Sequence, residues 1–408
     1  MSDEAAKHVD MMHEIETICA FDKRGPTKEG ERKAAEYLER RFEEMGLEPS
    51  VEHFKISPHY YWVYFVHMVL ALATGVACIW TNPAWIPPVC AGVILLVTIS
   101  FWGDLTTKFH LIRNIIPRYP SQNVIGRVPE EGAKKKVFLT AHYDAAKVGE
   151  HVFDPDLDEK VAKFYKEKFN STPNVMMPII LCMLALFLVA VFRIPFKGGD
   201  VMWIVTGIVQ GIASIGLLIA AVSFFDISTG FYVPGAIDNL TAVAACMSIA
   251  EEVLREPLKN IDFSIVAVGC EEAIMMGMVQ FMKRHSYLSK EDTYFINLES
   301  IGNGTVFYGV REGFVRARPY SKELVKIAES LKENGEFPEL QTYEVRLGTD
   351  AMVPLVRGYK SISIFAFNEN NFCPYYHSMQ DVPENVDINV TRRARDLAMR
   401  MLRELDKA

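Results

Sequence analysis

Two long stretches of the chain are apolar, and each is split near its middle by a short segment that interrupts the apolar pattern. Residues 56–103 contain no Asp, Glu, Lys or Arg, but the internal segment TNPAWIPP carries three prolines. Residues 169–192 and 201–225 are also free of charge, and the segment RIPFKGGD separates them. A spanning helix needs about 20 apolar residues, and a core helix of a soluble protein keeps a charged outer face. We therefore predict two transmembrane helical hairpins, over 59–104 and 173–225.

The remaining segments alternate helical and strand patterns. They are 1–58, 105–172 and 226–408. Residues 27–49 form an amphipathic helical pattern that stops at Gly46. Further helices are expected at AVAACMSIAEEVL (242–254) and SKELVKIAESLKENG, and strands at NVIGRV, KKVFLTA (135–141), IDFSIVAVG, TYFINLE and KSISIFAF. This alternation is typical of one α/β domain whose central sheet is covered by helices on both faces. The hairpins are then insertions into its loops.

Composition narrows the classes of function. Charged residues make up 23% of the chain, which is too many for a protein wholly embedded in the bilayer. The net charge of −8 argues against nucleic-acid binding, which requires basic patches. The cysteines form no CxxC pair, so we expect free thiols in a reducing compartment. The first 21 residues lack the apolar centre of a signal peptide and are predicted to form an amphipathic helix.

The basic residues near the expected spans predict their orientation. On the domain side these are Lys55, Lys108, Arg113, Arg118, Lys160, Lys163, Lys166 and Lys168. The hairpin tips carry only Arg193 and Lys197. Because basic loops stay in the cytoplasm, we expect four spans and a cytoplasmic α/β domain.

Histidine and acidic residues recur where the expected strands end. They are His142 and Asp144 in VFLTAHYD, Asp238 in VPGAIDNLTAVA, Glu271 and Glu272 after IDFSIVAVGC, Glu299 after TYFIN, and His377 in PYYHSMQDVPEN. Ligands of open α/β sheets bind outside the carboxyl ends of strands, so these side chains are expected to converge. Imidazoles and carboxylates are zinc ligands. Two zinc ions about 3.5–4 Å apart would need a bridging carboxylate.

The adjacent glutamates of GCEE are the most informative pair. Like charges at the end of a buried strand repel each other and are costly to desolvate. Metal ions nearby would stabilise both, with Glu272 as a ligand and Glu271 taking a proton from metal-bound water. Each motif alone also has a simpler interpretation. HYD occurs in ordinary chain, and two glutamates at a helix start are favoured by the helix dipole.

The order AHYD, PGAIDN, GCEE, NLE and YHSMQDVPE resembles the zinc exopeptidase family of co-catalytic di-zinc aminopeptidases and glutamate carboxypeptidases. The upstream segments GPTKEGERKAAEYLERRFEEMGLE and SQNVIG also fit the start of that domain. The resemblance implies a mixed central sheet with helices on both faces. Glu299 stands where soluble aminopeptidases usually carry Asp. In this respect the chain is similar to the multi-pass endoplasmic-reticulum and vacuolar membrane metallopeptidases.

The resemblance also implies a role for each residue. Two zinc ions are expected, with His142 and Glu299 on the first, Glu272 and His377 on the second, and Asp238 between them. Glu271 falls on the general base, and Asp144 on a residue that orients the His142 imidazole. Tyr376 falls on a tyrosine that stabilises the oxyanion, with the adjacent Tyr375 as the alternative. Asp350 falls in a pocket-lining segment and is either a substrate-binding residue or part of a turn. The peptide bond after the bridging aspartate is often cis in this family.

The resulting hypothesis is a membrane-embedded di-zinc exopeptidase acting on peptides, and more specifically an aminopeptidase. Glu299 in place of Asp leaves the preference for the amino terminus open, so carboxypeptidase activity is an alternative. Two others are a non-catalytic membrane scaffold of the same fold and a glutaminyl-cyclase type of reaction. The acidic run DPDLDEK (154–160) lacks the Gly and the terminal Glu of a calcium loop, and we expect a solvated linker there.

Overall fold

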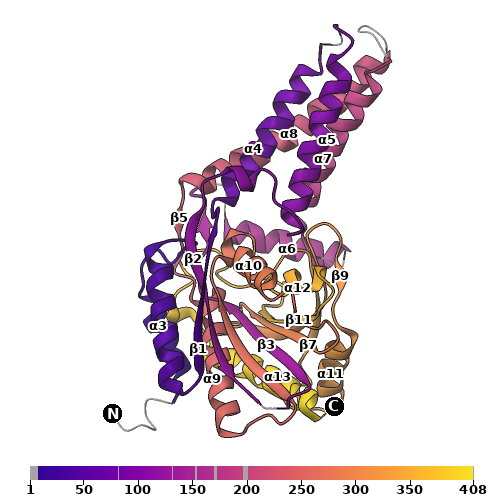
Figure 1. Ribbon diagram of the computed structural model, residues 1–408. Helices are drawn as coiled ribbons and strands as arrows, with labels where there is room; N and C mark the ends of the chain where they lie inside the picture. The colour runs from indigo at the N-terminus through magenta and orange to yellow at the C-terminus, as the bar shows by residue number, and fades with distance from the viewer. Residues whose placement is uncertain are drawn as a thin grey trace.

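The computed structural model describes residues 8–80, 82–130, 132–151, 154–169, 172–195 and 201–407. A bundle of apolar helices stands on one end of an α/β domain (Figure 1). The second expected hairpin tip lies largely outside the described residues, at 196–200.

A nine-stranded mixed sheet forms the centre of the domain. In spatial order its strands are β1 (Glu48–Ile56), β2 (Tyr119–Val128), β6 (Ile261–Val268), β3 (Lys135–His142), β7 (Thr293–Glu299), β11 (Lys360–Phe367), β8 (Thr305–Glu312) and β10 (Gln341–Val345), with β9 (Arg318–Pro319) beside β8. The four central strands β6, β3, β7 and β11 run parallel, while β2 and β8 pair antiparallel with their inner neighbours. A short ribbon, β4 (Lys147–Val148) with β5 (Phe231–Tyr232), lies apart from it.

Helices cover both faces of the sheet, as the sequence predicted. One face packs against α2 (Met11–Cys19), α3 (Glu29–Met45), α9 (Thr241–Arg255), α11 (Lys322–Glu333) and α13 (Ile388–Lys407). The other face packs against α10 (Met276–Arg284) and α12 (Met352–Val356). Helix α3 ends where expected, because Gly46 adopts a left-handed φ of 93° that favours glycine.

The helical bundle shares a core with the second face of the sheet. Its helices are α4 (Tyr60–Ala77), α5 (Ile86–Leu105), α7 (Met177–Phe192) and α8 (Val201–Thr229). Phe295 of β7, Phe281 of α10 and Phe101 of α5 belong to one buried apolar cluster. The bundle and the domain are therefore packed together rather than merely tethered.

The outside of the bundle is apolar. Helix α8 exposes Ile208, Ile212, Ile215 and Ile219 at helical spacing. Apolar surface of this extent is characteristic of membrane contact. Helices α4, α5 and α8 are long and apolar enough to cross a membrane, whereas α7, with 16 residues, is shorter. Three of the four expected spans thus meet the length requirement.

A buried ion pair anchors the first hairpin to the domain. Arg113 donates three hydrogen bonds to the carboxylate of Asp104 at the end of α5, at 2.6, 2.9 and 3.3 Å. The same guanidinium donates to the carbonyl oxygens of Ser57, before α4, and of Ala273, each at 3.0 Å. Ala273 follows the glutamate pair directly. One side chain therefore joins both ends of the hairpin to the glutamate turn.

The expected linker at 154–160 is wrong, because this segment begins helix α6 (Pro155–Phe169). The Asp154 carboxylate caps the helix by accepting hydrogen bonds from the backbone N–H groups of Asp156 and Leu157. Acidic residues fill the first turn, and Lys166 and Lys168 lie in the last, which suits the helix dipole. The acidic run was thus a helix start.

Candidate metal centre

The parallel strands bring the predicted residues to one edge of the sheet. Strands β6, β3 and β7 are neighbours, so their carboxyl ends meet. His142 is the last residue of β3, Glu299 ends β7, and the glutamate pair follows β6. Asp238 lies in the turn Ala236–Leu240 that precedes α9, and His377 lies in the loop after β11. The expected convergence is found.

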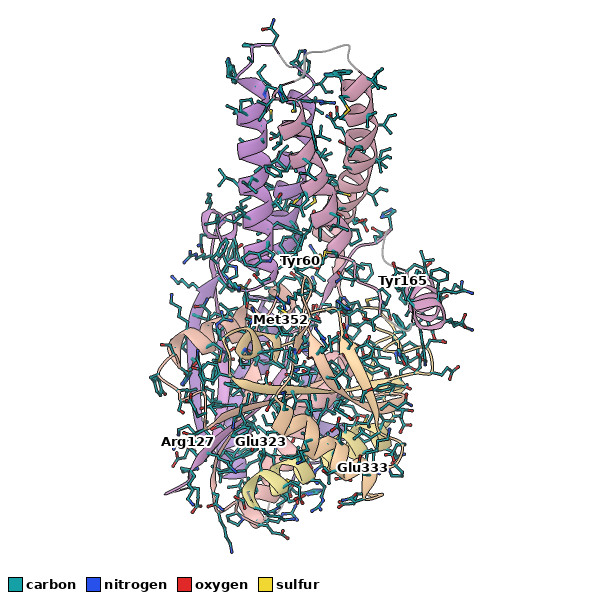
Figure 2. The ribbon with its side chains drawn as sticks, turned by 90° about the vertical axis from the view of Figure 1, so that its right-hand side faces the viewer. Tyr60, Arg127, Tyr165, Glu323, Glu333 and Met352 are labelled. Carbon is teal, nitrogen blue, oxygen red and sulfur yellow. The ribbon has the colours of Figure 1, made fainter. Side chains whose placement is uncertain are left out.

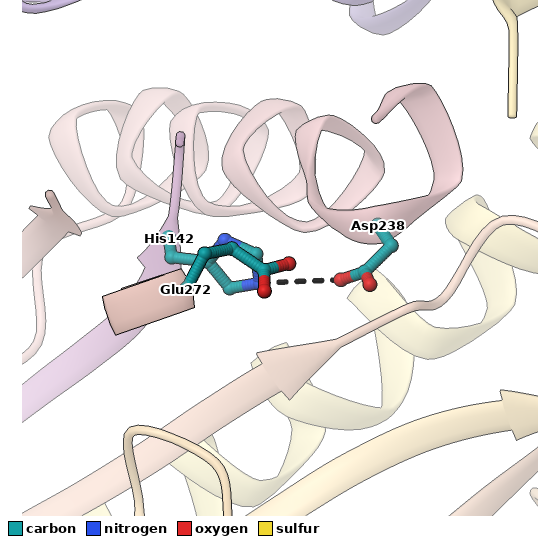
Figure 3. A group of neighbouring side chains, drawn as sticks. All are labelled: His142, Asp238 and Glu272. Carbon is teal, nitrogen blue, oxygen red and sulfur yellow. Dashed lines mark hydrogen bonds and ion pairs between the residues drawn. The ribbon is translucent and has the colours of Figure 1, made fainter. Parts of the chain in front are cut away.

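Asp238 lies between two imidazoles. One of its carboxylate oxygens is 3.2 Å from His142 Nε2, and the other is 3.3 Å from His377 Nε2 (Figure 3 shows the first contact). His142 Nε2 is also 3.2 Å from a Glu299 oxygen, and His377 Nε2 is 3.3 Å from a Glu272 oxygen. The five side chains therefore form two sets of one histidine and one glutamate, joined by one shared aspartate.

These distances fit a pair of zinc ions. Atoms bound to one tetrahedral zinc at about 2.0–2.2 Å lie about 3.3–3.6 Å from each other. The four nitrogen-to-oxygen contacts of 3.2–3.3 Å are close to that separation. Ligand atoms of His142, Asp238 and Glu272 also all lie within 4.8 Å of one another. The donor set is therefore suited to two cations that share Asp238.

The electrostatics of the centre favour positive charge. Burial alone would lower the pKa of His377, but the charges of Glu272 and Asp238 raise it to about 10. Burial likewise opposes protonation of His142, and the charge of Glu299 still raises its pKa well above the usual range. Burial raises the pKa of Glu271 well above its ordinary value. A buried site with more carboxylates than imidazoles therefore attracts cations.

Asp144 holds the glutamate turn in place. Its two carboxylate oxygens accept hydrogen bonds from the backbone N–H groups of Glu271 and Glu272, both at 3.0 Å. His142 Nδ1 lies closer to the Asp144 carbonyl oxygen, at 3.1 Å, than to its carboxylate, at 3.6 Å. Asp144 thus contacts the expected imidazole mainly through its backbone, while its side chain fixes the two glutamates.

The two tyrosines and Asp350 fall into different surroundings. The Tyr376 ring stacks on the His377 imidazole, with centroids 3.8 Å apart and planes 17° apart. Both Tyr375 and Tyr376 pack against the apolar cluster that contains Phe365, so the stacking on His377 is what distinguishes Tyr376. Asp350 is fully buried, and its carboxylate has no hydrogen-bond partner among the described residues. Burial, together with the nearby charge of Glu299, raises the pKa of Asp350 well above its usual value. These surroundings favour Tyr376 over Tyr375, and a site position for Asp350.

Two residues that support Asp238 escaped the sequence analysis. The Asp381 carboxylate accepts hydrogen bonds from the backbone N–H groups of Ile237 and Asp238, at 2.5 and 3.1 Å. Arg24 is buried and donates to the carbonyl oxygens of Tyr143, at 2.7 Å, and of Gly235, at 2.9 Å. It therefore ties the loop after β3 to the loop that carries Asp238. Asp381 lies within the motif YHSMQDVPE and could have been singled out there, whereas nothing in the sequence marks Arg24. The peptide bond after Asp238 is cis.

Replacing Asp144 with Asn tests the support of the glutamate turn. Asn offers one acceptor oxygen in place of two, so one of the two backbone N–H groups would face an amide NH2. We expect zinc affinity to fall by about 10–100-fold, as for other supporting residues of metal sites, when measured by competition with a chelator. Asp387→Asn is the matched control, because Asp387 also accepts a backbone N–H but is exposed. Equal affinity in both variants would contradict the role of Asp144.

One sequence family and several solved structures are similar to this chain. The sequence model described as peptidase family M28 matches residues 218–402, a range that includes Asp238, Glu272, Glu299 and His377. No curated protein sequence matches the chain. Among solved structures, a leucine aminopeptidase precursor from Bacteroides thetaiotaomicron is similar at 13% identity and a TM-score of 0.53, covering 96% of this chain and 95% of that one.

Two further structures share the fold. A Zn-dependent exopeptidase from Parabacteroides distasonis has 13% identity and a TM-score of 0.53, with 96% of each chain covered. A glutaminyl cyclase from Bacteroides thetaiotaomicron has the same identity and TM-score, with 97% of this chain and 99% of that one covered. Residues 218–402 thus match peptidase family M28, within a chain whose α/β fold is like that of zinc aminopeptidases.

Proposed function

We propose that the protein is a membrane-embedded di-zinc exopeptidase that removes residues from the amino termini of peptides. The observation that carries the proposal is the position of Asp238, whose two oxygens each contact a different imidazole. Each imidazole contacts a different oxygen of Asp238, as expected where two metals share one carboxylate. The match to peptidase family M28 supports a zinc-dependent peptidase.

The residues around the centre would have separate roles in the reaction. His142, Glu299, Glu272 and His377 would hold the two zinc ions, with Asp238 shared. When bound, zinc would polarise the scissile carbonyl and make a water nucleophilic near neutral pH.

Glu271 makes no ion pair among the described residues, although both neighbouring histidines pair with other carboxylates. It is the group left to take the proton from the attacking water and pass it to the leaving amine. Asp144 holds the Glu271 backbone so that its carboxylate stays oriented. Tyr376, whose ring stacks on His377, would stabilise the oxyanion by donating a hydrogen bond from its hydroxyl group.

The helical bundle would place this chemistry at a membrane surface. Three helices are long and apolar enough to span, and α7 would complete the second hairpin. We propose hairpins at 59–104 and 173–225, and a peptidase domain made of 1–58, 105–172 and 226–408. The basic residues flanking the hairpins favour a cytoplasmic position for that domain.

A glutaminyl cyclase is the second candidate, because the fold is shared with such an enzyme. A cyclase would convert an amino-terminal glutamine into a ring without cleaving a peptide bond. The shared Asp238 between two histidines favours hydrolysis with two metals. A scaffold without activity would not require the half-buried carboxylate of Glu271, which forms no ion pair among the described residues.

The two reactions differ in their products from one set of peptides. We expect release of the first residue from peptides with a free amino terminus, and little turnover when that terminus is acetylated, as read by mass spectrometry. Cyclisation of Gln-initiated peptides without cleavage would show the alternative activity. Cleavage that requires a free carboxyl terminus would show a carboxypeptidase.

The two adjacent glutamates should respond differently to the same substitution. Glu271→Gln keeps size and polarity but cannot accept a proton, so we expect kcat to fall by about 10²–10⁴-fold with zinc content unchanged. Glu272→Gln removes an anionic ligand, so zinc content should fall and excess zinc should restore part of the activity. Zinc content by elemental analysis and kcat are measured for both variants and for the wild type. The wild type is expected to hold two zinc ions per chain.

Each outcome of this pair has a clear meaning. Loss of metal in Glu271→Gln together with retention in Glu272→Gln would reverse the two roles. Full activity and full metal in both variants would reduce the pair to a helix cap and exclude the peptidase mechanism. At most one zinc in an unchelated wild type would exclude the shared-aspartate site.

Labelling of introduced cysteines tests the topology. Asn82 lies at the tip of the first hairpin, and Tyr287 is exposed on the domain. If the domain is cytoplasmic, a membrane-impermeant thiol reagent should label Asn82→Cys in intact cells and Tyr287→Cys only after lysis. The reverse pattern would place the domain outside.

A further inference from the structure

A cavity lies where the first hairpin joins the domain. Its volume is about 790 Å³, which is in the range of ligand pockets. Its walls come from the chain just before α4, from the loop after α5, from α10 and the residues that follow it, and from the segment after α12. None of the five candidate metal ligands lines this cavity.

The lining of the cavity is basic. It includes Lys55, Lys108, His110, Arg113, Arg118, Lys283, Lys290 and Arg357, and no aspartate or glutamate. Such a concentration is unexpected in a chain with a net charge of −8. A cavity lined by charges of one sign concentrates ligands of the opposite sign.

Few of these cations are neutralised within the protein. Arg113 and His110 share the Asp104 carboxylate. Among the described residues, the other cationic lining residues form no ion pair with a carboxylate. Lys108 lies over the Trp102 ring and Lys290 over the Tyr359 ring, both apolar partners. The net charge presented to the cavity is therefore strongly positive.

Arg357 has a fixed position in the wall. It donates to the hydroxyl and to the carbonyl oxygen of Thr107, at 3.1 and 2.9 Å, and to the Val353 carbonyl oxygen at 2.8 Å. All of these acceptors are neutral, so its positive charge is not compensated. A guanidinium held in this way is already ordered before an anion arrives, which lowers the entropic cost of binding.

Two further polar groups of the wall lack partners. The Ser57 side chain is 2% exposed, and its hydroxyl has no hydrogen-bond partner among the described residues. The buried Nε2 of His110 has none either. Of the two, the Ser57 hydroxyl can donate to an acceptor oxygen of a ligand, whereas His110 Nδ1 already donates to Asp104, which leaves Nε2 of the neutral imidazole an acceptor.

The location identifies the source of such a ligand. Ser57 precedes α4, which begins at Tyr60, and Thr107 follows α5, which ends at Leu105. Tyr60 lies at the junction of bundle and domain in Figure 2. If α4 and α5 span the bilayer, the cavity lies at the level of the lipid headgroups. The cytoplasmic leaflet carries anionic lipids that basic clusters at this level attract.

We propose that this cavity binds the phosphomonoester headgroup of an anionic phospholipid. A phosphomonoester carries more negative charge than the phosphodiester of an ordinary phospholipid and has three terminal oxygens, which matches several uncompensated cations and the unpartnered Ser57 hydroxyl. The proposal depends on the insertion of the bundle into a membrane and is independent of the zinc chemistry.

The test uses the full chain in phosphatidylcholine nanodiscs. We expect tighter binding of phosphatidic acid than of phosphatidylserine when both are compared at equal surface charge, as read by native mass spectrometry of retained lipid. The variant Lys283→Gln/Lys290→Gln removes two exposed cations of the cavity. It should weaken phosphatidic acid binding by at least about tenfold, since each basic residue near a membrane contributes appreciably.

The matched control is Lys160→Gln/Lys163→Gln on α6, which removes two exposed lysines outside the cavity. It should change the affinity by less than about twofold if the cavity, and not diffuse charge, binds the lipid. Equal losses in both variants, or equal binding of the two lipids, would overturn the proposal in favour of diffuse attraction. Displacement by inorganic phosphate at the affinity of the lipid would identify a soluble phosphate ligand and overturn the lipid assignment. Peptide turnover in parallel reports folding separately.

Discussion

The structure depends on the gathering of carboxylate groups at one site, which is unfavourable by itself. The carboxylates of Asp144, Asp238 and Asp350 are buried and that of Glu271 is half-buried, and two imidazoles lie among them. Desolvation and mutual repulsion both act against this arrangement. Divalent cations are the agents that would make it favourable, since they are the largest local charges that a protein site can hold. The contacts around the centre hold these carboxylates in place.

Backbone contacts do most of that positioning. Asp144 fixes the glutamate turn, Asp381 fixes the segment that carries Asp238, and Arg24 joins that segment to the loop after β3. Each side chain satisfies peptide groups that would otherwise be unpaired at the ends of strands and helices. The centre is thereby held by three polar side chains rather than by apolar packing alone. A substitution of any of these three residues would displace the candidate metal ligands while leaving each of them in the chain.

The sequence predicted the parts of the fold whose signal lies within one segment. Strands β3, β6, β7 and β11 are continuous apolar runs, and α3 combines an amphipathic pattern with a terminal glycine, so each was predicted close to its observed bounds. Strand β1 was missed because half-exposed residues dilute its alternation. Helix α13 was also missed, although its apolar residues Leu397, Met401 and Leu405 recur at helical spacing.

In the site, too, residues with a local sequence signal were predicted, and residues that act through distant parts of the chain were not. The predicted ligands could be found because histidine and acidic residues at strand ends are visible in the sequence, and the structure brings them together. Arg24 could not be found in this way, because its partners are carbonyl oxygens of residues far along the chain. The basic cavity was visible only in part. Lys55, Lys108 and Arg113 were recognised as residues flanking a span, but their proximity to Lys283 and Arg357 depends on the tertiary fold.

Helix α10 connects the two charged regions of the molecule. It begins at Met276, directly after the glutamate turn, and Lys283 and Arg284 lie in its last turn. The positive end of its dipole therefore faces the acidic centre, and its negative end lies beside basic residues. Arg113 contacts the same glutamate turn through Ala273 while also lining the basic cavity. Arg113, already paired with Asp104, therefore joins the turn of the proposed general base to the wall of the basic cavity.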